Sequence, residues 1–437
     1  MEPVAPAGRA EPLLRQLSVV GIWLLVVNGM IGAGIFGVPA DVARLAGAYS
    51  PLVFVLCGLL IAPVMLSFAE VASYFRGTGG PMLYVRTAFG AHAGFQAGWV
   101  FYVARITAAA ANINLLVSSA AYFWAGLGQG GPRMLLLLGI CVGLAWVNVV
   151  GARQAMRSLG TLTVLKFLPL LMLIAIGAWQ LLALDSRPAT LSAPGSAGFG
   201  TAMLIAIYAF VGFESALVPA GEAKSPARDM PRALFWGLAV VTALYVLLQY
   251  ISIALLPGLE GTDRPLVDVA AVLMGPVGAM LMMGGVVASV GGNIAGSMFS
   301  TPRISYALAR DGLLPAWLGH VHERHRTPDH SVIFYATLMF VLAVLGSFVW
   351  LAAMSVVARL FIYLTCIGAV PRLRREFGDA QDALRAPGGY LVPVLAALAC
   401  LVLLAQVRLQ GLLVMAALMA LGALLYYSHS RRAGKAA

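Results

Sequence analysis

The chain consists largely of apolar runs that are long enough to cross a lipid bilayer. A transmembrane helix needs about 20 mostly apolar residues, and runs of this size recur along almost the whole sequence. Of the 437 residues, 61% are hydrophobic and only 10% are charged, whereas a soluble domain carries about 25% charged residues. Within a bilayer the backbone polar groups must be satisfied internally, which a helix does within one segment. The sequence therefore predicts an all-α integral membrane protein and excludes a soluble, disordered or collagen-like chain.

Twelve transmembrane helices can be placed along the chain. We expect a disordered cytoplasmic tail at 1–16, a membrane core at 17–370, a cytoplasmic loop at 371–389, a final pair of helices at 390–428 and a cytoplasmic tail at 429–437. The predicted spans are 18–46, 50–74, 94–124, 133–151, 159–183, 199–220, 233–257, 274–303, 331–349, 351–370, 390–406 and 409–427.

Basic residues are distributed unevenly between the two sides that these spans define. With both termini inside, the cytoplasmic segments hold 20 of the 28 Lys and Arg residues, the outer segments hold five, and three lie within spans. Cytoplasmic loops of membrane proteins carry an excess of Lys and Arg, so this distribution supports an even number of spans. The net charge of +11 is explained by topology, and nucleic acid is not an expected partner.

The cysteine and histidine patterns do not predict a metal or a cofactor. The cysteines fall in apolar spans without ligand spacing, as small core residues do: Cys57, Cys141, Cys366 and Cys400. The histidines of one polar loop lack the helical His and Glu spacing of a metalloprotease, and we expect them to be solvated: His320, His322, His325 and His330. No phosphate-binding loop is present, so we do not expect ATP-driven transport, and no buried catalytic cluster is evident, so we do not expect an enzyme.

Four glycines interrupt the first predicted span. They lie within the sequence NGMIGAGIFGVP, which runs from residue 28 to 39: Gly29, Gly32, Gly34 and Gly37. Each glycine destabilises a helix interior by about 1 kcal/mol relative to alanine, and the four share no single face for helix packing. Non-helical backbone survives at membrane depth only where it is buried in protein or lines a wet cavity. We therefore expect the first helix to be unwound near the middle of the membrane.

The sixth predicted span contains a comparable interruption, at Gly212, which is followed by Glu214. Aligning Gly34 with Gly212 gives an offset of 178 residues, which also relates the starts of spans two and three to those of spans seven and eight. Five helices in each repeat invert the second relative to the first. The sequence thus predicts a five-plus-five inverted repeat, 18–183 and 199–370, whose paired interruptions point to a transporter binding site.

Four segments, in order and at matching spacing, resemble motifs of one transporter superfamily. They are Gly32–Phe36 (GAGIF), Ala69–Val71 with Gly79–Gly90, Gly212–Ser215 with Gly221–Pro231, and Arg303 with Ala309–Pro315. In these segments the chain resembles an amino acid permease of the amino acid–polyamine–organocation superfamily, over about residues 18 to 370. The resemblance implies a LeuT-like fold in which helices 1 and 6 are unwound at mid-membrane and bind the substrate.

In the proteins that the chain resembles, the backbone at these two breaks binds the amino and carboxyl groups of the substrate. Free N–H groups at the start of a half-helix suit a carboxylate, and free carbonyl groups at the end of the other half suit an ammonium group. We expect the carboxylate at the first break and the amine at the second. The residues concerned are Ile31, Gly32, Ala33, Gly34, Ile35 and Phe36, and then Tyr208, Ala209, Phe210, Val211, Gly212 and Phe213.

Three residues of the spans are candidates for coupling or gating. Lys166 resembles the family lysine that replaces a sodium ion between helices one and eight, where it would exchange a proton; snorkelling to the helix end is the alternative. Glu214 resembles a glutamate tied to proton sensing or gating in arginine–agmatine-type antiporters, and a purely structural hydrogen-bonding role is the alternative. Tyr208 stands at the matching position of an aromatic gate.

Two arginines and a further glutamate also lie within the spans. Arg105, another gating or coupling candidate, either neutralises Glu214 or Glu70 or binds a substrate carboxylate, and we expect the structural pairing. Arg359 is expected to be a buried or snorkelling cation of the same kind. Glu70 is expected to pair with a loop arginine.

These features predict a secondary active transporter of amino acids in the inner membrane of a bacterium. The expected partners are an amino acid or related amine, protons and the lipid bilayer, and the expected state is a monomer or homodimer. Proton-coupled symport and amino-acid exchange are both compatible with Lys166 and Glu214. A polyamine or organic-cation antiporter, or an amino-acid exporter, is the alternative, and cation export is favoured if Glu214 faces the pocket while Arg105 points away. A non-transporting membrane sensor is a remote alternative.

Overall fold

The computed structural model describes residues 18–75, 80–151, 153–184, 196–214, 226–377 and 384–436. Regular structure in these ranges is helical, and no strand occurs among them. A π-helical turn, Val287–Gly291, joins α11 to α12. The α-helices are α1 (Val19–Met30), α2 (Ala33–Ala46), α3 (Ser50–Ser73), α4 (Gly80–Phe89), α5 (Ala91–Ala120), α6 (Gly130–Gly151), α7 (Arg153–Leu184), α8 (Ser196–Phe210), α10 (Pro226–Leu255), α11 (Pro265–Val286), α12 (Gly292–Ser300), α13 (Pro302–Arg310), α14 (Asp329–Leu345), α15 (Phe348–Phe377), α16 (Leu391–Leu404) and α17 (Leu409–Ala436).

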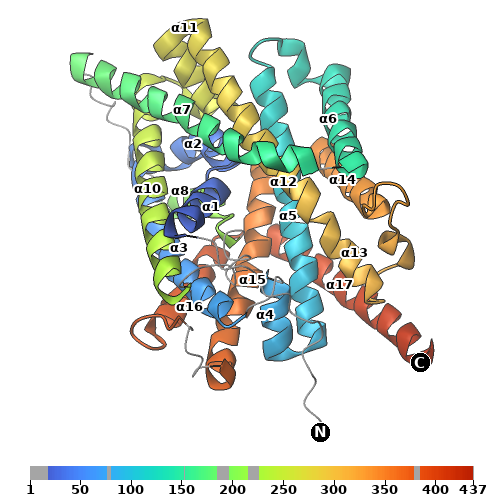
Figure 1. The fold of residues 1–437 in the computed structure, drawn as a ribbon. Coiled ribbons are helices and arrows are strands. Elements are labelled where there is room, and N and C mark those ends of the chain that lie inside the picture. The colour runs from blue at the N-terminus through green and yellow to red at the C-terminus, as the bar shows by residue number, and fades with distance from the viewer. Residues whose placement is uncertain are drawn as a thin grey trace.

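The helices form a bundle (Figure 1), and many large apolar side chains are exposed on its outer surface. Eight segments of the described chain are long and apolar enough to cross a membrane, and four shorter apolar helices accompany them. Large apolar side chains such as Trp146, Trp179 and Leu182 are exposed on this surface, which contact with lipid explains. Every predicted span overlaps helix in the structure, while the number of twelve crossings stays a prediction.

Some helices extend beyond the predicted spans. Helix α15 continues to Phe377 and α17 to Ala436, into segments that were expected to be a loop and a tail. Basic side chains near a helix C-terminus are favourable, so a helix can continue where its apolar span ends. Helix α11 begins at Pro265, ahead of the predicted start at 274, but Gly275 has a φ of 65° and Pro276 follows it. The predicted start therefore lies beside a kink.

Two helix breaks lie at the predicted glycines. Between α1 and α2, Ile31 and Gly32 are non-helical. After α8, the chain turns at 211–213, where Gly212 has a φ of 112°. Such a positive φ favours glycine, because in other residues the contact of Cβ with the backbone destabilises this conformation. The rest of the predicted sixth span, 215–220, lies outside the described residues.

The two breaks contact each other through their backbones. A Cβ atom added to Gly212 would lie 2.2 Å from the carbonyl oxygen of Gly29, and one added to Gly29 would lie 2.5 Å from that of Gly212. A Cβ atom on Gly34 would lie 2.4 Å from Cα of Ala209 in α8. Close packing therefore explains the glycines at positions 29 and 34, whereas Gly32 lies at the break itself.

Candidate functional site

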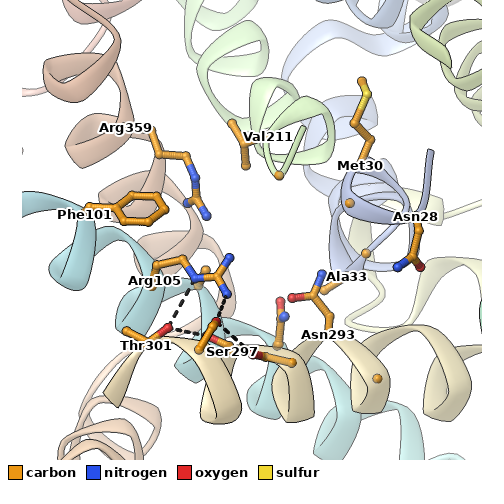
Figure 2. A pocket seen from close by; sticks show the side chains of 18 of the residues that line it. Asn28, Met30, Ala33, Phe101, Arg105, Val211, Asn293, Ser297, Thr301 and Arg359 are labelled. Atoms are coloured by element: carbon orange, nitrogen blue, oxygen red, sulfur yellow. Dashed lines mark hydrogen bonds between the residues drawn. The ribbon is translucent and has the colours of Figure 1, made fainter. Parts of the chain in front are cut away.

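A cavity of about 750 Å³ adjoins both breaks. Helices α1, α2 and α8 form one side of its wall, and α5 with α12 and α13 form the other. Figure 2 shows Asn28, Met30 and Ala33 across this space from Arg105 and Thr301. The wall continues from the breaks to Gly80–Met82 at the start of α4 and to the first two turns of α13. The structure therefore brings the two interrupted helices to one shared space.

Half of the predicted substrate-binding residues line this cavity. Those that line it are Gly32, Ala33, Gly34, Tyr208, Val211 and Gly212. The other six are buried outside the lining: Ile31, Ile35, Phe36, Ala209, Phe210 and Phe213. With about 3.6 residues per helical turn, one helix cannot present six consecutive side chains to one space. The buried aromatic rings pack instead, with Phe210 against Tyr245 and Phe213 against Tyr363.

Helix ends supply backbone polar groups at the breaks. The first N–H groups of α2 and the last carbonyl groups of α8 have no partner within their own helices, as at every helix terminus. Gly32, Ala33 and Gly34 at the start of α2 line the cavity. The Tyr245 hydroxyl of α10 lies 2.9 Å from the carbonyl oxygens of both Met30 and Ala209. One tyrosine can thus donate to the end of α1 or to the end of α8.

Lys166 lies at the C-terminal end of α1. Its Nζ donates to the Ile31 carbonyl oxygen at 2.6 Å, and to the side-chain and backbone oxygens of Asn28 at 2.6 and 3.0 Å. Ser289, from the π-helical turn, donates to the same Ile31 oxygen at 3.2 Å. The lysine is 2% exposed and has no carboxylate within salt-bridge distance among the described residues. A cation suits this position, since a helix C-terminus carries partial negative charge.

Glu214 forms a buried ion pair with Arg359, not with Arg105. The Nε atom of Arg359 lies 2.9 Å from Oε1 of Glu214, and the two side chains are 5% and 2% exposed. The other oxygen, Oε2, accepts the Gly212 N–H at 2.9 Å and the Tyr363 hydroxyl at 3.3 Å. This carboxylate therefore fixes the turn at the second break and lies outside the cavity lining, whereas Arg359 lines the cavity.

Arg105 lines the cavity without an acidic partner in the described part of the chain. Its Nη2 donates to the Ser300 hydroxyl at 2.8 Å and its Nε to the Thr301 hydroxyl at 3.3 Å. The guanidinium also lies over the ring of Phe101, 5.9 Å from its centroid. The expected pairing with Glu214 or Glu70 is therefore not what the structure shows, because each of these glutamates has another arginine.

Tyr208 lines the cavity and contacts both α5 and α15. Its hydroxyl donates to Oδ1 of Asn112 at 2.8 Å and lies 3.3 Å from the Ala108 carbonyl oxygen. Its ring meets that of Phe348 edge-on, with centroids 5.9 Å apart. The aromatic residue expected at a gate thus contacts both neighbouring helices.

Glu70 pairs with Arg374, near the end of α15. The arginine donates two hydrogen bonds to the carboxylate, at 2.5 and 2.8 Å. The Ala386 N–H and the Tyr74 hydroxyl donate to it at 3.0 Å. The expected pairing of Glu70 with an arginine is confirmed. The partner was expected in a loop but lies in α15, which continues past the predicted end of its span at residue 370.

The loop histidines are only partly solvated. His320 Nδ1 lies 2.7 Å from Oδ1 of Asp329 and its ring stacks on that of His330, with centroids 4.2 Å apart. Potential ligand atoms of His320, Asp329 and His330 lie within 4.8 Å of one another. The Asp329 oxygen is already engaged by His320 and by the His330 N–H, so the contacts hold the loop against the start of α14.

Sequence reasoning missed several polar residues that meet at this site. Asn112, Asn293 and Ser297 line the cavity, and Tyr245 bridges the two helix ends. A polar side chain within an apolar span was the available signal, since such residues tend to face a bundle interior or a cavity.

Known proteins match the chain along nearly its full length. A family model described as amino acid permease matches residues 17–428. The chain is 26% identical to the branched-chain amino acid permease BcaP of Bacillus subtilis, over 99% of this chain and 96% of that protein. It is also 26% identical to the serine/threonine exchanger SteT of Bacillus subtilis, over 88% and 89%. An uncharacterized transporter of Mycobacterium tuberculosis is 29% identical, over 85% and 83%. The chain therefore belongs to the amino acid permease family of the amino acid–polyamine–organocation superfamily, whose members here are transporters and not enzymes.

Proposed function

We propose that the protein is a secondary active transporter that moves amino acids across the bacterial inner membrane by alternating access. The observation that carries the proposal is the meeting of two helix breaks at one cavity, because paired interruptions in two halves are typical of transporter binding sites. The proposal includes twelve transmembrane helices in a LeuT-like five-plus-five inverted repeat, with both termini in the cytoplasm. The protein acts as a monomer or homodimer.

In this proposal the backbone at the breaks binds the groups that all α-amino acids share. The carboxylate accepts from the first N–H groups of α2, near Gly32–Gly34, where the helix dipole is positive. The ammonium group donates to the last carbonyl groups of α8, near Tyr208–Phe210. The contact of Gly29 with Gly212 supports this arrangement, since it holds the two helix ends within reach of one small molecule.

Lys166 is the proposed coupling residue. Its three hydrogen bonds to Asn28 and Ile31 join α7 to the end of α1. Loss of a proton from Nζ removes one donor and the charge that faces the helix terminus, which weakens this contact and frees α1 to move. If the lysine keeps its proton throughout the cycle, the same contacts make it a fixed cation, and the protein exchanges amino acids.

The proposed movement is a rocking of one group of helices against another. The moving group is α1, α2, α3, α8 and α10, and the scaffold is α5, α6, α14 and the segment α11–α13. The cavity lies between these groups. It reaches the start of α4 and the first turns of α13, which the predicted topology assigns to the cytoplasm, and we take the contact of Tyr208 with Phe348 as its closed end. The structure thus fits an inward-facing state, and a substrate that binds one state better shifts the population.

Two observations weigh against cation export. Glu214 is engaged by Arg359 and Gly212 and does not line the cavity, whereas Arg105 does. A polyamine site would need the opposite arrangement, with the carboxylate facing the substrate. The same geometry leaves amino-acid export open as a direction of transport, because the direction depends on gradients and not on the site.

The test is uptake of a mixed panel of radiolabelled amino acids into proteoliposomes. One set of vesicles is alkaline inside, and a second set has no gradient but is preloaded with unlabelled amino acids. Gradient-driven accumulation that Lys166→Ala abolishes is the expected result for proton-coupled transport. Uptake only into preloaded vesicles indicates exchange. Absence of flux for every amino acid in both sets would refute the proposed function.

A further inference from the structure

The charged side chains that line the cavity in the described part of the chain are all positive. The basic residues of its lining are Arg105, Lys166, Arg303 and Arg359, and no carboxylate lines it within the described ranges. Two of these cations are already balanced, Arg359 by Glu214 and Lys166 by the oxygens at the end of α1. Arg303 donates to the Phe299 carbonyl oxygen and stacks on the Phe299 ring. Arg105, like Lys166 and Arg303, therefore has only neutral protein partners among the described residues, and of these three cations it is the one directed towards Arg359 (Figure 2).

The contacts of Arg105 leave part of its guanidinium available. Nε and Nη2 donate to the hydroxyls of Thr301 and Ser300, and Nη1 has no partner among the described residues. Figure 2 shows the guanidinium directed into the same space as that of Arg359. The two guanidinium groups therefore share one space, and Glu214 supplies only one negative charge for the two.

The energetics of this arrangement favour an anionic ligand. A cation within the membrane interior costs a few kcal/mol unless it is paired or hydrated. Arg105, Arg359 and Glu214 together carry one net positive charge. A planar guanidinium matches the geometry of a carboxylate, with two parallel hydrogen bonds, so a carboxylate on the substrate satisfies the free donors and neutralises the cluster.

We propose that the transported amino acid carries a second carboxylate, as aspartate and glutamate do, and that Arg105 binds this side-chain group. The inference rests on the proposed function, because the α-amino and α-carboxyl groups are then held at the two breaks. The side chain extends from there across the cavity towards α5, and Ser300 and Thr301 hold the guanidinium in place. Arg105 is thus a specificity-determining residue. Diamines and basic amino acids are disfavoured, since they would add positive charge.

The experiment measures initial uptake by proteoliposomes that contain the purified full-length protein. Radiolabelled L-glutamate, L-aspartate, L-glutamine and L-leucine are used one at a time, with exchange and gradient conditions both present. We expect wild type to take up glutamate and aspartate in preference to glutamine. Arg105→Gln should lower the glutamate-to-glutamine uptake ratio at least about tenfold, the effect of losing a charge-assisted hydrogen bond.

The ratio separates a loss of recognition from a loss of folding, because misfolded protein loses both substrates alike. Arg105→Lys keeps the charge without the planar fork and should give an intermediate ratio. Arg310→Gln is the matched control, because it removes an exposed arginine of α13 that does not line the cavity, and its ratio should equal that of wild type.

Two results would overturn the inference while leaving amino-acid transport intact. One is uptake of leucine or glutamine by wild type that excess glutamate and aspartate do not inhibit. The other is an unchanged glutamate-to-glutamine ratio in Arg105→Gln, or in Arg105→Lys if the first variant is inactive. Absence of uptake for all four amino acids also overturns the inference if the mixed panel is transported, and it counts against the proposed function, on which the inference rests, if the mixed panel is not transported either.

Discussion

The Nε atom of Arg359 lies 2.9 Å from Oε1 of Glu214, and both side chains are almost completely buried. The pair joins α15 to the turn at the second break, because the other oxygen of the carboxylate accepts the Gly212 N–H. The shape of that turn therefore depends on a charge that the solvent does not reach. Removing one partner of a buried pair leaves the other charge uncompensated, which costs far more than removing both.

A double-mutant cycle tests this pair. Glu214→Met and Arg359→Met should each lower the free energy of unfolding by about 3–5 kcal/mol, whereas the double variant should be close to wild type. Thermal unfolding in detergent, followed by tryptophan fluorescence, gives the midpoint temperature of each variant, and the shifts of this temperature rank the losses of stability. Arg44→Gln is the control, because Arg44 pairs with Asp41 at the surface and its side chain is 55% exposed. It should change the free energy of unfolding by about 0–1 kcal/mol. Additive losses in the double variant would show that the two residues act independently.

Substitution of Gly212 by alanine should abolish transport. The new Cβ would overlap the Gly29 carbonyl oxygen, and the φ of 112° is unfavourable for alanine. We expect initial uptake to fall more than tenfold, and the unfolding midpoint to fall with it. Gly143→Ala in α6 is the matched control, since its Cβ would meet nothing within 4 Å. Wild-type uptake by Gly212→Ala would contradict a requirement for close contact between the breaks.

On the proposed mode of transport, Tyr208 contributes to closure of the cavity through two separable contacts. Tyr208→Phe keeps the ring contact with Phe348 but loses the 2.8 Å hydrogen bond to Asn112. Since such a bond contributes about 0.5–1.5 kcal/mol, we expect KM for uptake to rise about two- to tenfold. Tyr208→Ala loses both contacts and should have a larger effect. Tyr250→Phe, at a tyrosine that is 41% exposed, should leave KM unchanged. Equal KM values for wild type and the three variants would show that Tyr208 does not contribute to a gate.

The carboxylate of Glu70 holds the segment that follows α15. Glu70→Gln removes the charge that binds Arg374 and weakens the acceptor of the Ala386 N–H. We expect faster hydrogen exchange in a peptide covering residues 384–390, with little change in α5. Mass spectrometry of the exchanged protein provides this comparison. Unchanged protection in that peptide would mean that other contacts, such as that between the Leu384 N–H and Ser73, are sufficient.

Local sequence signals predicted the helix breaks but not the orientation of the residues around them. A glycine cluster in an apolar span is costly wherever the helix points, so the interruptions at Gly32 and Gly212 follow from the sequence alone. The rotation of α2 and α8 does not. Next to the breaks these helices are apolar on every side, so the sequence pattern does not show which face of each helix points to the cavity. Six consecutive residues were therefore assigned to the site at each break, where three line it.

Ion pairs between distant segments were beyond local signals as well. Glu214 and Arg359 are separated by 145 residues, and their meeting depends on how α15 lies against the second break. The sequence offered Arg105 and Arg359 as equivalent buried cations. Both arginines line the cavity, and only the packing of α5 and α15 distinguishes Arg359, which pairs with a glutamate, from Arg105, whose partners are neutral.

The backbone contact between Gly29 and Gly212 has a thermodynamic consequence for ligand recognition. Since no side chain separates the two helix ends, a displacement of either one is transmitted to the other. On the proposed mode of binding, the sites for the carboxylate and the ammonium group are therefore not independent. A molecule that carries both groups should bind far more tightly than a simple carboxylic acid and a simple amine supplied together, so the glycine contact makes the zwitterion itself the unit that the protein recognises.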